Sequence, residues 1–145
     1  MKLPDVNLWL ALSISGHAHH RAAKDWFEAQ ATPSSIAFCR TTQQGWLRLI
    51  TLADLVQRYQ LPPLTNQNAW KALDAFMEDE RIAFCQEPEE LESQWRVFAA
   101  RNVASSKLWM DAYLAAFAVT GGMQIVTFDK GFSPFAGLDL ELLTV

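Results

Sequence analysis

The sequence lacks several features that would assign it to a familiar class. It has two cysteines, Cys39 and Cys85, each at the end of an IAFC run, and no CxxC pair. This excludes a disulfide-built fold and a cysteine zinc knuckle, so we predict two buried free thiols in a reducing compartment. A signal-peptide pattern is also missing, and no apolar run approaches the length needed to cross a bilayer. We therefore expect a soluble, cytoplasmic protein without membrane contact.

An excess of basic residues is missing as well. Twelve lysines and arginines face 16 aspartates and glutamates, which gives a net charge of -4. The whole molecule therefore does not attract nucleic acid by bulk charge, and a polyanionic substrate would need a local basic patch. Internal repeats, low-complexity segments and interdomain linkers are absent too, so we predict a single domain over residues 1–145.

The chain is instead rich in apolar residues, which make up 50% of it and include six tryptophans. That content is enough to build a sizeable core. Apolar runs predict strands at residues 2–4, 34–38, 81–85 and 124–128, an alternating pattern predicts a fifth at residues 138–145, and helical patterns fill the segments between them. Helix N-caps are predicted at Thr41 or Thr42, at Thr65 or Asn66, and at Ser105 or Ser106, with a break in the helical pattern near residues 51–53. This alternation predicts a three-layer α/β/α sandwich with a mainly parallel central sheet of about five strands.

Three aspartates stand out against this framework. Asp5 and Asp129 follow the first and fourth predicted strands, and the carboxyl ends of parallel strands share one edge of a sheet. Asp111 lies in a helix of residues 108–119 that is apolar nearly all round, which predicts burial on most faces. A buried, unpaired carboxylate costs several kcal/mol. A shared divalent cation would explain all three acids, and ligands that are all oxygen favour Mg²⁺ or Mn²⁺.

Simpler roles are open for each of these residues. Asp5 and Asp129 would serve equally well as helix N-caps, and Asp111 as an acid that answers the helix dipole. The histidines of the HAHH run at residues 17–20 suggest zinc, but no cysteine or acid in that segment completes a tetrahedral set. Most aromatic residues are expected in the core, with Trp46, Trp70 and Trp109 as candidates for base stacking or partner binding.

Four segments follow one another along nearly the whole chain: DVNLWLAL, a threonine-containing helix start before GWLRLIT, MDAYLAAFA and TFDKGF. In this order they resemble the PIN domain, specifically the toxin ribonucleases of VapBC toxin–antitoxin pairs. The resemblance implies that Asp5, Asp111 and Asp129 hold one or two Mg²⁺ or Mn²⁺ ions. It also implies that the protein cuts tRNA or other structured RNA, is silenced by a VapB-like antitoxin and forms a homodimer.

One position departs from the resembling family. Many PIN domains carry a glutamate in the first turn of the helix after the second strand, and TTQQGWLRL places Gln43 there. Gln43 would complete the catalytic set as a neutral oxygen ligand, with weaker binding of a second metal ion. The alternative for Gln43 is an ordinary exposed residue of the first helical turn.

Substrate contacts are expected from a few polar side chains near the acids. Asn7, Arg40, Arg48 and Lys130 are candidates for binding RNA phosphates, although each also suits an ordinary surface role. The function predicted first is a Mg²⁺- or Mn²⁺-dependent endoribonuclease toxin. A catalytically weak PIN-like module that binds RNA or protein is the alternative, and a small-molecule phosphatase would lack a visible nucleophile motif.

Overall fold

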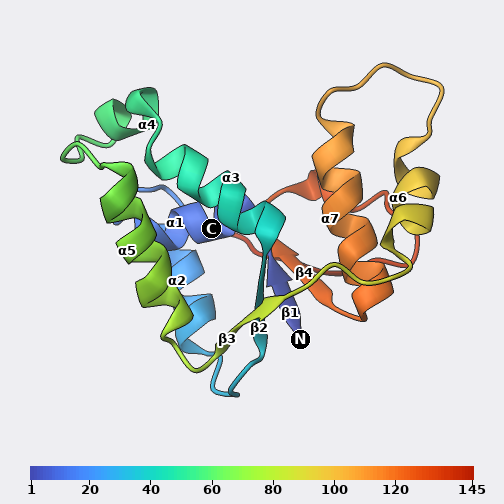
Figure 1. Ribbon diagram of the computed structural model, residues 1–145, viewed down its shortest axis with the longest axis horizontal. Helices are drawn as coiled ribbons and strands as arrows, with labels where there is room; N and C mark the ends of the chain where they lie inside the picture. Colours follow the sequence, from blue (N-terminus) through green and yellow to red (C-terminus); the bar gives the residue numbers. More distant parts are fainter.

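A computed structural model describes all 145 residues and is built on a parallel five-stranded sheet (Figure 1). The strands are β1 (Lys2–Pro4), β2 (Ile36–Cys39), β3 (Ile82–Cys85), β4 (Gln124–Thr127) and β5 (Asp139–Leu142). Their order is β3-β2-β1-β4-β5, and every neighbouring pair is parallel. The predicted parallel sheet of five strands is confirmed.

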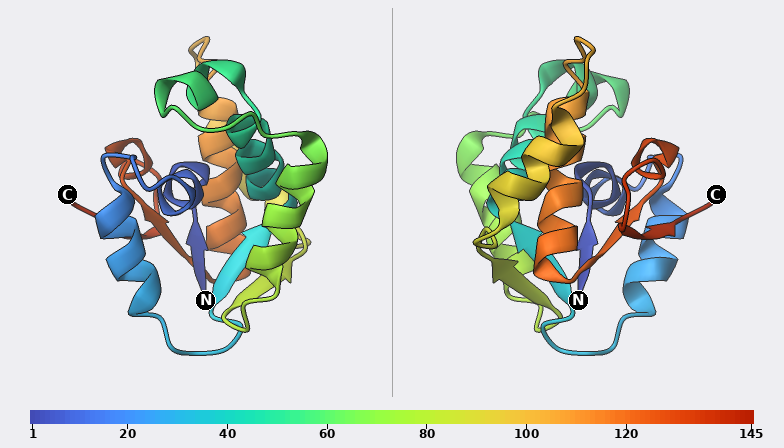
Figure 2. Two further views of the ribbon diagram at one scale, coloured as in Figure 1. Left: turned by 90° about the vertical axis from the view of Figure 1, so that its left-hand side faces the viewer. Right: turned by 90° about the vertical axis from the view of Figure 1, so that its right-hand side faces the viewer.

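Helices cover both faces of this sheet. They are α1 (Val6–Ser13), α2 (His20–Glu28), α3 (Arg40–Ile50), α4 (Ala53–Arg58), α5 (Asn66–Met77), α6 (Leu91–Ala99), α7 (Leu108–Gly121) and the 3₁₀ turn η1 (Lys130–Phe132). Helices α2 and α5 lie on one side of the sheet, and α6 and α7 lie on the other (Figures 1 and 2). The predicted three-layer arrangement is therefore confirmed. None of the helices combines the length and apolar character needed to cross a membrane.

Successive strand residues supply two separate cores, because side chains alternate between the faces of a strand. Ile36 and Phe38 of β2 face α1, α3 and α5, where the Phe38 ring stacks on Trp9 with centroids 4.0 Å apart. Ala37 and Cys39 face α6 and α7. Burial on both faces explains why β1, β2 and β4 appear in the sequence as continuous apolar runs rather than as alternating patterns.

The helix ends follow the sequence only in part. Thr65 caps α5 through its side chain, and the break predicted near residues 51–53 separates α3 from α4. Gly122 ends α7 with φ 64°, a left-handed conformation that favours glycine. The prediction of Ser105 or Ser106 as the cap of that helix is wrong, because α7 begins at Leu108 and no side chain caps it.

The start of α3 also differs from the prediction of a Thr41 or Thr42 cap. The N-cap residue is Cys39, and its N–H donates to the Thr42 hydroxyl at 3.1 Å. Thr42 therefore completes the helix start from inside the first turn. Both cysteines are free, as predicted, but only Cys39 is buried, because Cys85 lies on the edge strand β3 and is partly exposed.

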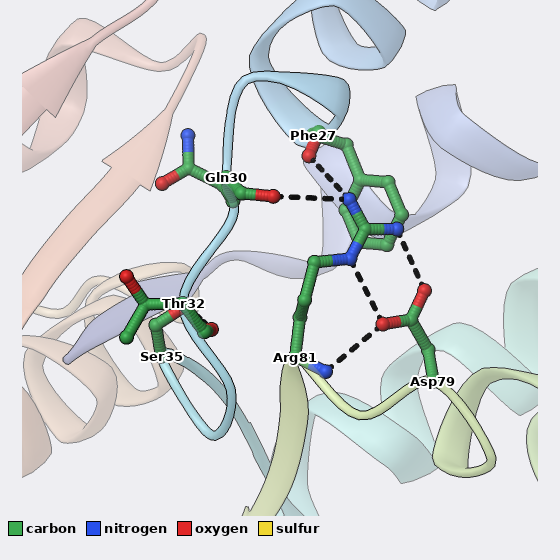
Figure 3. Close-up of polar contacts among 6 residues, drawn as sticks. All are labelled: Phe27, Gln30, Thr32, Ser35, Asp79 and Arg81. Carbon is green, nitrogen blue, oxygen red and sulfur yellow. Dashed lines mark hydrogen bonds and ion pairs between the residues drawn. The ribbon is translucent and has the colours of Figure 1, made fainter.

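An arginine clasp ties α2 to the amino end of β3 (Figure 3). The Arg81 guanidinium donates twice to the Asp79 carboxylate, at 2.9 and 2.7 Å. Its remaining nitrogen donates to the carbonyl oxygens of Phe27 at 2.9 Å and Gln30 at 3.2 Å. The guanidinium also lies 4.0 Å from the centre of the Phe27 ring. Four charge-assisted hydrogen bonds thus hold the end of the sheet opposite to the strand carboxyl termini.

Candidate active site

The predicted acids lie where the strand order reverses. Strand β1 stands between β2 and β4, and the chain crosses from one half of the sheet to the other at this point. Pro4 of β1 pairs with Val126 of β4, so the carboxyl ends of the two strands lie together. Asp5 follows the first of these ends and Asp129 the second. Ligand crevices of open α/β sheets form at this kind of switch point.

A cavity of about 200 Å³ opens at that edge of the sheet. The three predicted acids line it together with residues of α1, α3, α7 and η1: Asp5, Val6, Asn7, Thr41, Thr42, Gly45, Arg48, Leu49, Met110, Asp111, Leu114, Asp129 and Phe132. Two of the expected substrate contacts, Asn7 and Arg48, are in this lining. Three carboxylates from distant parts of the sequence therefore share one cavity.

Asp5 is the most enclosed of the three acids, with 5% of its surface exposed. One carboxylate oxygen accepts from the Leu8 N–H at 2.8 Å, which makes Asp5 the N-cap of α1. The other oxygen accepts from the Thr127 hydroxyl at 2.6 Å. The simpler role considered for Asp5 is therefore correct, and it coexists with a place in the cavity lining.

Thr127 is a site residue that the sequence reasoning missed. It is fully buried, donates to Asp5, and accepts from the Asp129 N–H at 2.9 Å. The Thr127 hydroxyl thus connects the side chain of Asp5 to the backbone of Asp129. The signal was weak, because threonine is an ordinary strand residue. Its position two residues before Asp129, at the end of an apolar strand, was the available clue.

Asp111 is more open to solvent than predicted, and Asp129 is exposed. Asp129 accepts from the Gly131 N–H at 2.7 Å and so caps η1, which is again the simpler role considered for it. Asp111 lies in the first turn of α7 and is only half-buried. The expectation of burial on most faces fails at this turn, where Trp109 and Met110 are 58% and 57% exposed. The apolar composition of α7 reflects burial of its later turns.

Burial and mutual repulsion shape the charges of these acids. Burial raises the pKa of Asp5 from 3.8 to about 6, and repulsion from Asp129 and Asp111 adds to this rise. The hydrogen bonds that Asp5 accepts from Thr127 and Leu8 act in the opposite direction and lower the pKa. Burial and Asp129 also raise the pKa of Asp111, which Lys107 partly offsets. A neighbouring positive charge would relieve this crowding of like charges.

The acids suit a divalent metal in their chemistry, although they do not form a closed ligand cluster. No three histidine, cysteine, aspartate or glutamate side chains are assembled as a metal-binding group. The donors in the cavity are carboxylates, and hard cations such as Mg²⁺ bind through one or two carboxylates while keeping several waters. Asp5, Asp111 and Asp129 are thus the residues that could hold such an ion.

Gln43 is turned away from the acids. It is 4% exposed, which corrects the alternative of an exposed first-turn residue, and it does not line the cavity. Its carbonyl oxygen accepts from the Arg40 guanidinium at 2.7 Å, and its nitrogen faces the Met77 sulfur at 3.9 Å. The structure therefore does not bring Gln43 into contact with the cavity, and the oxygen proposed as a ligand is already engaged by a cation.

Two of the expected phosphate contacts also lie outside the cavity lining. Arg40 bonds Gln43 and stands 4.6 Å from the centre of the Phe84 ring. Lys130 is exposed at the start of η1. Arg48 is thus the cationic side chain that the structure places in the cavity lining.

The histidine run forms no metal site. The His17 ring nitrogen accepts from the His19 N–H at 3.0 Å, and the His20 ring bonds the Ala11 carbonyl oxygen at 2.8 Å. The His19 ring stacks on Phe128, with centroids 4.3 Å apart. The three rings are engaged separately, so the zinc alternative gains no support.

Comparison with known proteins places this fold and cavity in a family. Residues 2–138 match the PIN domain. Ribonuclease VapC41 of Mycobacterium tuberculosis is 51% identical over 144 residues, which cover 99% of each chain. Ribonuclease VapC38 of the same organism is 27% identical over 100% of this chain and 99% of its own.

Solved structures share the fold at low sequence identity. VapBC2 from Rickettsia felis, bound to a promoter DNA fragment, aligns with a TM-score of 0.68 at 15% identity and covers 99% of this chain and 98% of its own. Mycobacterium tuberculosis VapC20, described as a toxin that cleaves the sarcin–ricin loop, aligns with a TM-score of 0.63 at 19% identity over 96% and 99%. The arrangement of strands, the acids at the switch point and the full-length match together show that this chain belongs to the PIN domain family.

Proposed function

We propose that the protein is a Mg²⁺- or Mn²⁺-dependent endoribonuclease toxin that hydrolyses phosphodiester bonds of tRNA or another structured RNA. The observation that carries this proposal is the group of three carboxylates in one cavity at the switch point of the sheet. The 51% identity to a protein named a ribonuclease supports RNA as the substrate.

In this proposal Asp5, Asp111 and Asp129 hold the metal. A divalent cation at such a site supplies positive charge to the scissile phosphate and lowers the pKa of a bound water. The Leu8 N–H and the Thr127 hydroxyl hold the Asp5 carboxylate in a fixed position, so that both of its oxygens keep their orientation. Preorganisation of this kind avoids the cost of reorienting charged groups during the reaction.

Two further side chains bind the substrate in this proposal. Arg48 donates to a phosphate oxygen at the cavity mouth, because its guanidinium is exposed and forms no ion pair within the protein. Asn7, in the first turn of α1, donates to the phosphate or to a carboxylate.

The toxin proposal includes a partner and a setting. VapBC complexes and a toxin–antitoxin complex from Klebsiella pneumoniae share this fold, which supports a VapB-like antitoxin as the partner. We also infer a homodimer that works in the cytoplasm, where tRNA is found. Size-exclusion chromatography with light scattering, on the chain alone and with the product of a neighbouring antitoxin gene, measures both assemblies.

Cleavage of a total tRNA pool tests the activity. The purified chain should cut tRNA with Mg²⁺ or Mn²⁺, and EDTA should stop the reaction. Asp5→Asn should abolish cutting, whereas Asp74→Asn, which changes an exposed acid in the middle of α5, should leave it intact. Cutting that survives both EDTA and Asp5→Asn would contradict the proposed site.

One observation favours a second candidate function, a catalytically weak module that binds RNA or protein. Gln43 stands where many PIN domains carry a glutamate, and its side chain is turned away from the cavity, which leaves three acids there. Folded, antitoxin-free protein that binds tRNA but does not cut it with either metal would support this candidate.

A further inference from the structure

Helices α3 and α5 pack against each other (Figure 1). A second hollow, of about 250 Å³, lies between them and beside the acidic cavity. Its lining comes from α3 and the residue that ends it, and from the first turns of α5: Leu47, Arg48, Thr51, Asn66, Ala69 and Trp70. We refer to it as the Trp70 hollow. Arg48 lines both this hollow and the acidic cavity, so the two are neighbours that share one cationic side chain.

Trp70 gives this hollow its character. The residue is 54% exposed, although a tryptophan in an amphipathic helix would ordinarily be turned inward. The neighbouring Ala69 is buried, so Trp70 presents its ring at the surface beside the hollow rather than in the core. An exposed aromatic face next to a phosphate-binding cation is the combination that proteins use to hold unpaired bases.

The polar groups of the hollow have free hydrogen-bonding capacity. The Asn66 side chain forms no hydrogen bond within the protein, and its amide offers two donors and an acceptor. The Arg48 guanidinium forms no ion pair, and none of the six lining residues is acidic. The hollow is therefore complementary to an anionic ligand with a flat ring, although the protein as a whole is negatively charged.

We propose that the Trp70 hollow is a subsite for one unpaired base of the RNA substrate. Trp70 stacks on the base, Asn66 bonds its edge, and Arg48 binds the phosphate that joins this nucleotide to the one in the acidic cavity. The proposal rests on the ribonuclease function proposed above. The volume of the hollow is below the roughly 300–1,000 Å³ of pockets for drug-sized ligands, which suits a single base.

A comparable hollow on the other side of the cavity is a weaker candidate. It lies between α6 and α7 and contains Trp95 and Trp109. Its cation, Arg96, is paired with Glu92 at 2.9 Å, and none of its lining residues also lines the acidic cavity. This hollow therefore has no unpaired cation and shares no residue with the acidic cavity. Trp109 thus serves as a matched control for Trp70.

RNA binding by the full chain tests the subsite. The Asp5→Asn background prevents cleavage, and the probe is a fluorescein-labelled, single-stranded RNA 12-mer of mixed sequence, followed by fluorescence anisotropy in Mg²⁺. Trp70→Ala should raise the Kd about fivefold or more, because stacking on one base contributes this much. Trp70→Phe, which keeps a ring, and Trp109→Ala should each stay within about twofold of the parent.

The contribution of Arg48 has its own readout. Arg48→Gln should lower the slope of log Kd against log salt by about 0.7, the value for one phosphate contact on a single strand. Arg21→Gln, which changes an exposed cation on α2, should leave the slope unchanged. Ultraviolet cross-linking of the 12-mer with 4-thiouridine in place of uridine should label the peptide that contains Trp70.

The outcomes separate failure of the subsite from failure of the proposed function. If the parent binds the 12-mer and Trp70→Ala binds it equally well, the subsite is refuted while the ribonuclease stands. If Trp70→Ala instead changes the oligomeric mass and leaves the RNA affinity intact, the surface is a protein interface and the subsite is again refuted. If the parent neither binds RNA nor, with Asp5 restored, cuts tRNA, both proposals fall.

Discussion

Replacement of Asp5 by asparagine should stabilise the metal-free protein at neutral pH while it abolishes cleavage. Asp5 is almost fully buried, and its pKa rises from 3.8 to about 6 in the folded chain. Between these two pH values the folded protein therefore keeps the Asp5 proton, whereas the unfolded chain has released it. Stability should fall as pH rises through this window, with the full penalty present above about pH 6.

The size of the effect follows from the same shift. A rise from 3.8 to about 6 corresponds to about 3 kcal/mol of destabilisation of the ionised form. Asparagine carries no charge, is an equally good N-cap for the Leu8 N–H, and keeps a polar partner for Thr127. Asp5→Asn should thus raise the free energy of unfolding by up to about 3 kcal/mol at pH 7, which corresponds to a rise of about 1 M or more in the urea midpoint.

Urea unfolding in EDTA from pH 4 to pH 8 measures this directly. The parent should lose stability between about pH 4 and pH 6, and the variant should lose much less. Asp74→Asn, at an exposed position, should follow the parent. Added Mg²⁺ should stabilise the parent but not Asp5→Asn. A variant that is no more stable than the parent at pH 7, with the same pH profile, would refute the reasoning.

Three further changes test the surroundings of the site. Thr127→Val removes the hydroxyl bonded to Asp5, so it should lower the free energy of unfolding in urea by about 1–3 kcal/mol and abolish most tRNA cleavage. Thr127→Ser should restore both stability and cleavage, and full activity in the valine variant would contradict the positioning role. Gly45→Ala would place a methyl group 2.7 Å from a Val6 methyl and should destabilise the protein by about 1–3 kcal/mol. The double variant with Val6→Ala should recover this stability, and a stable single variant would show that α1 and α3 can separate. Gln43→Glu should change the Mn²⁺ affinity measured by calorimetry by less than about threefold, because the side chain lies outside the cavity. A larger gain in affinity would show that the substituted side chain can turn toward the cavity.

The sequence predicted the sheet well because parallel strands leave a simple pattern. Strands β1, β2 and β4 are largely buried on both faces and appear as short apolar runs. The edge strands β3 and β5 are more exposed, and an apolar run and an alternating pattern, respectively, located them. All five strands were predicted to within a few residues. The acids that follow β1 and β4 then had to share one edge of the sheet. The position of the cavity was thus predictable from the order of the elements alone. The N-cap role of Asp5 and its place in the cavity lining could not be told apart from the sequence, because one carboxylate has both.

The details that failed depend on contacts between distant residues. The direction of the Gln43 side chain is set by Arg40 and by Met77 of α5, which no local pattern reveals. Thr127 acts through Asp5, 122 residues away in the sequence. Trp109 lies edge-to-face against Trp95 of α6 and is still 58% exposed, because α6 covers only part of the first turn of α7. Composition alone does not show which faces of a helical turn a neighbouring element covers.

The arginine clasp and the acidic cavity lie at opposite ends of the same strands, and this separation bears on how such a protein can evolve. Arg81 secures the amino end of the sheet through groups that never face the cavity. Substitutions around the cavity mouth therefore leave that anchor intact. In a chain built in this way the cavity lining can change at one end of the strands while the clasp preserves the scaffold at the other.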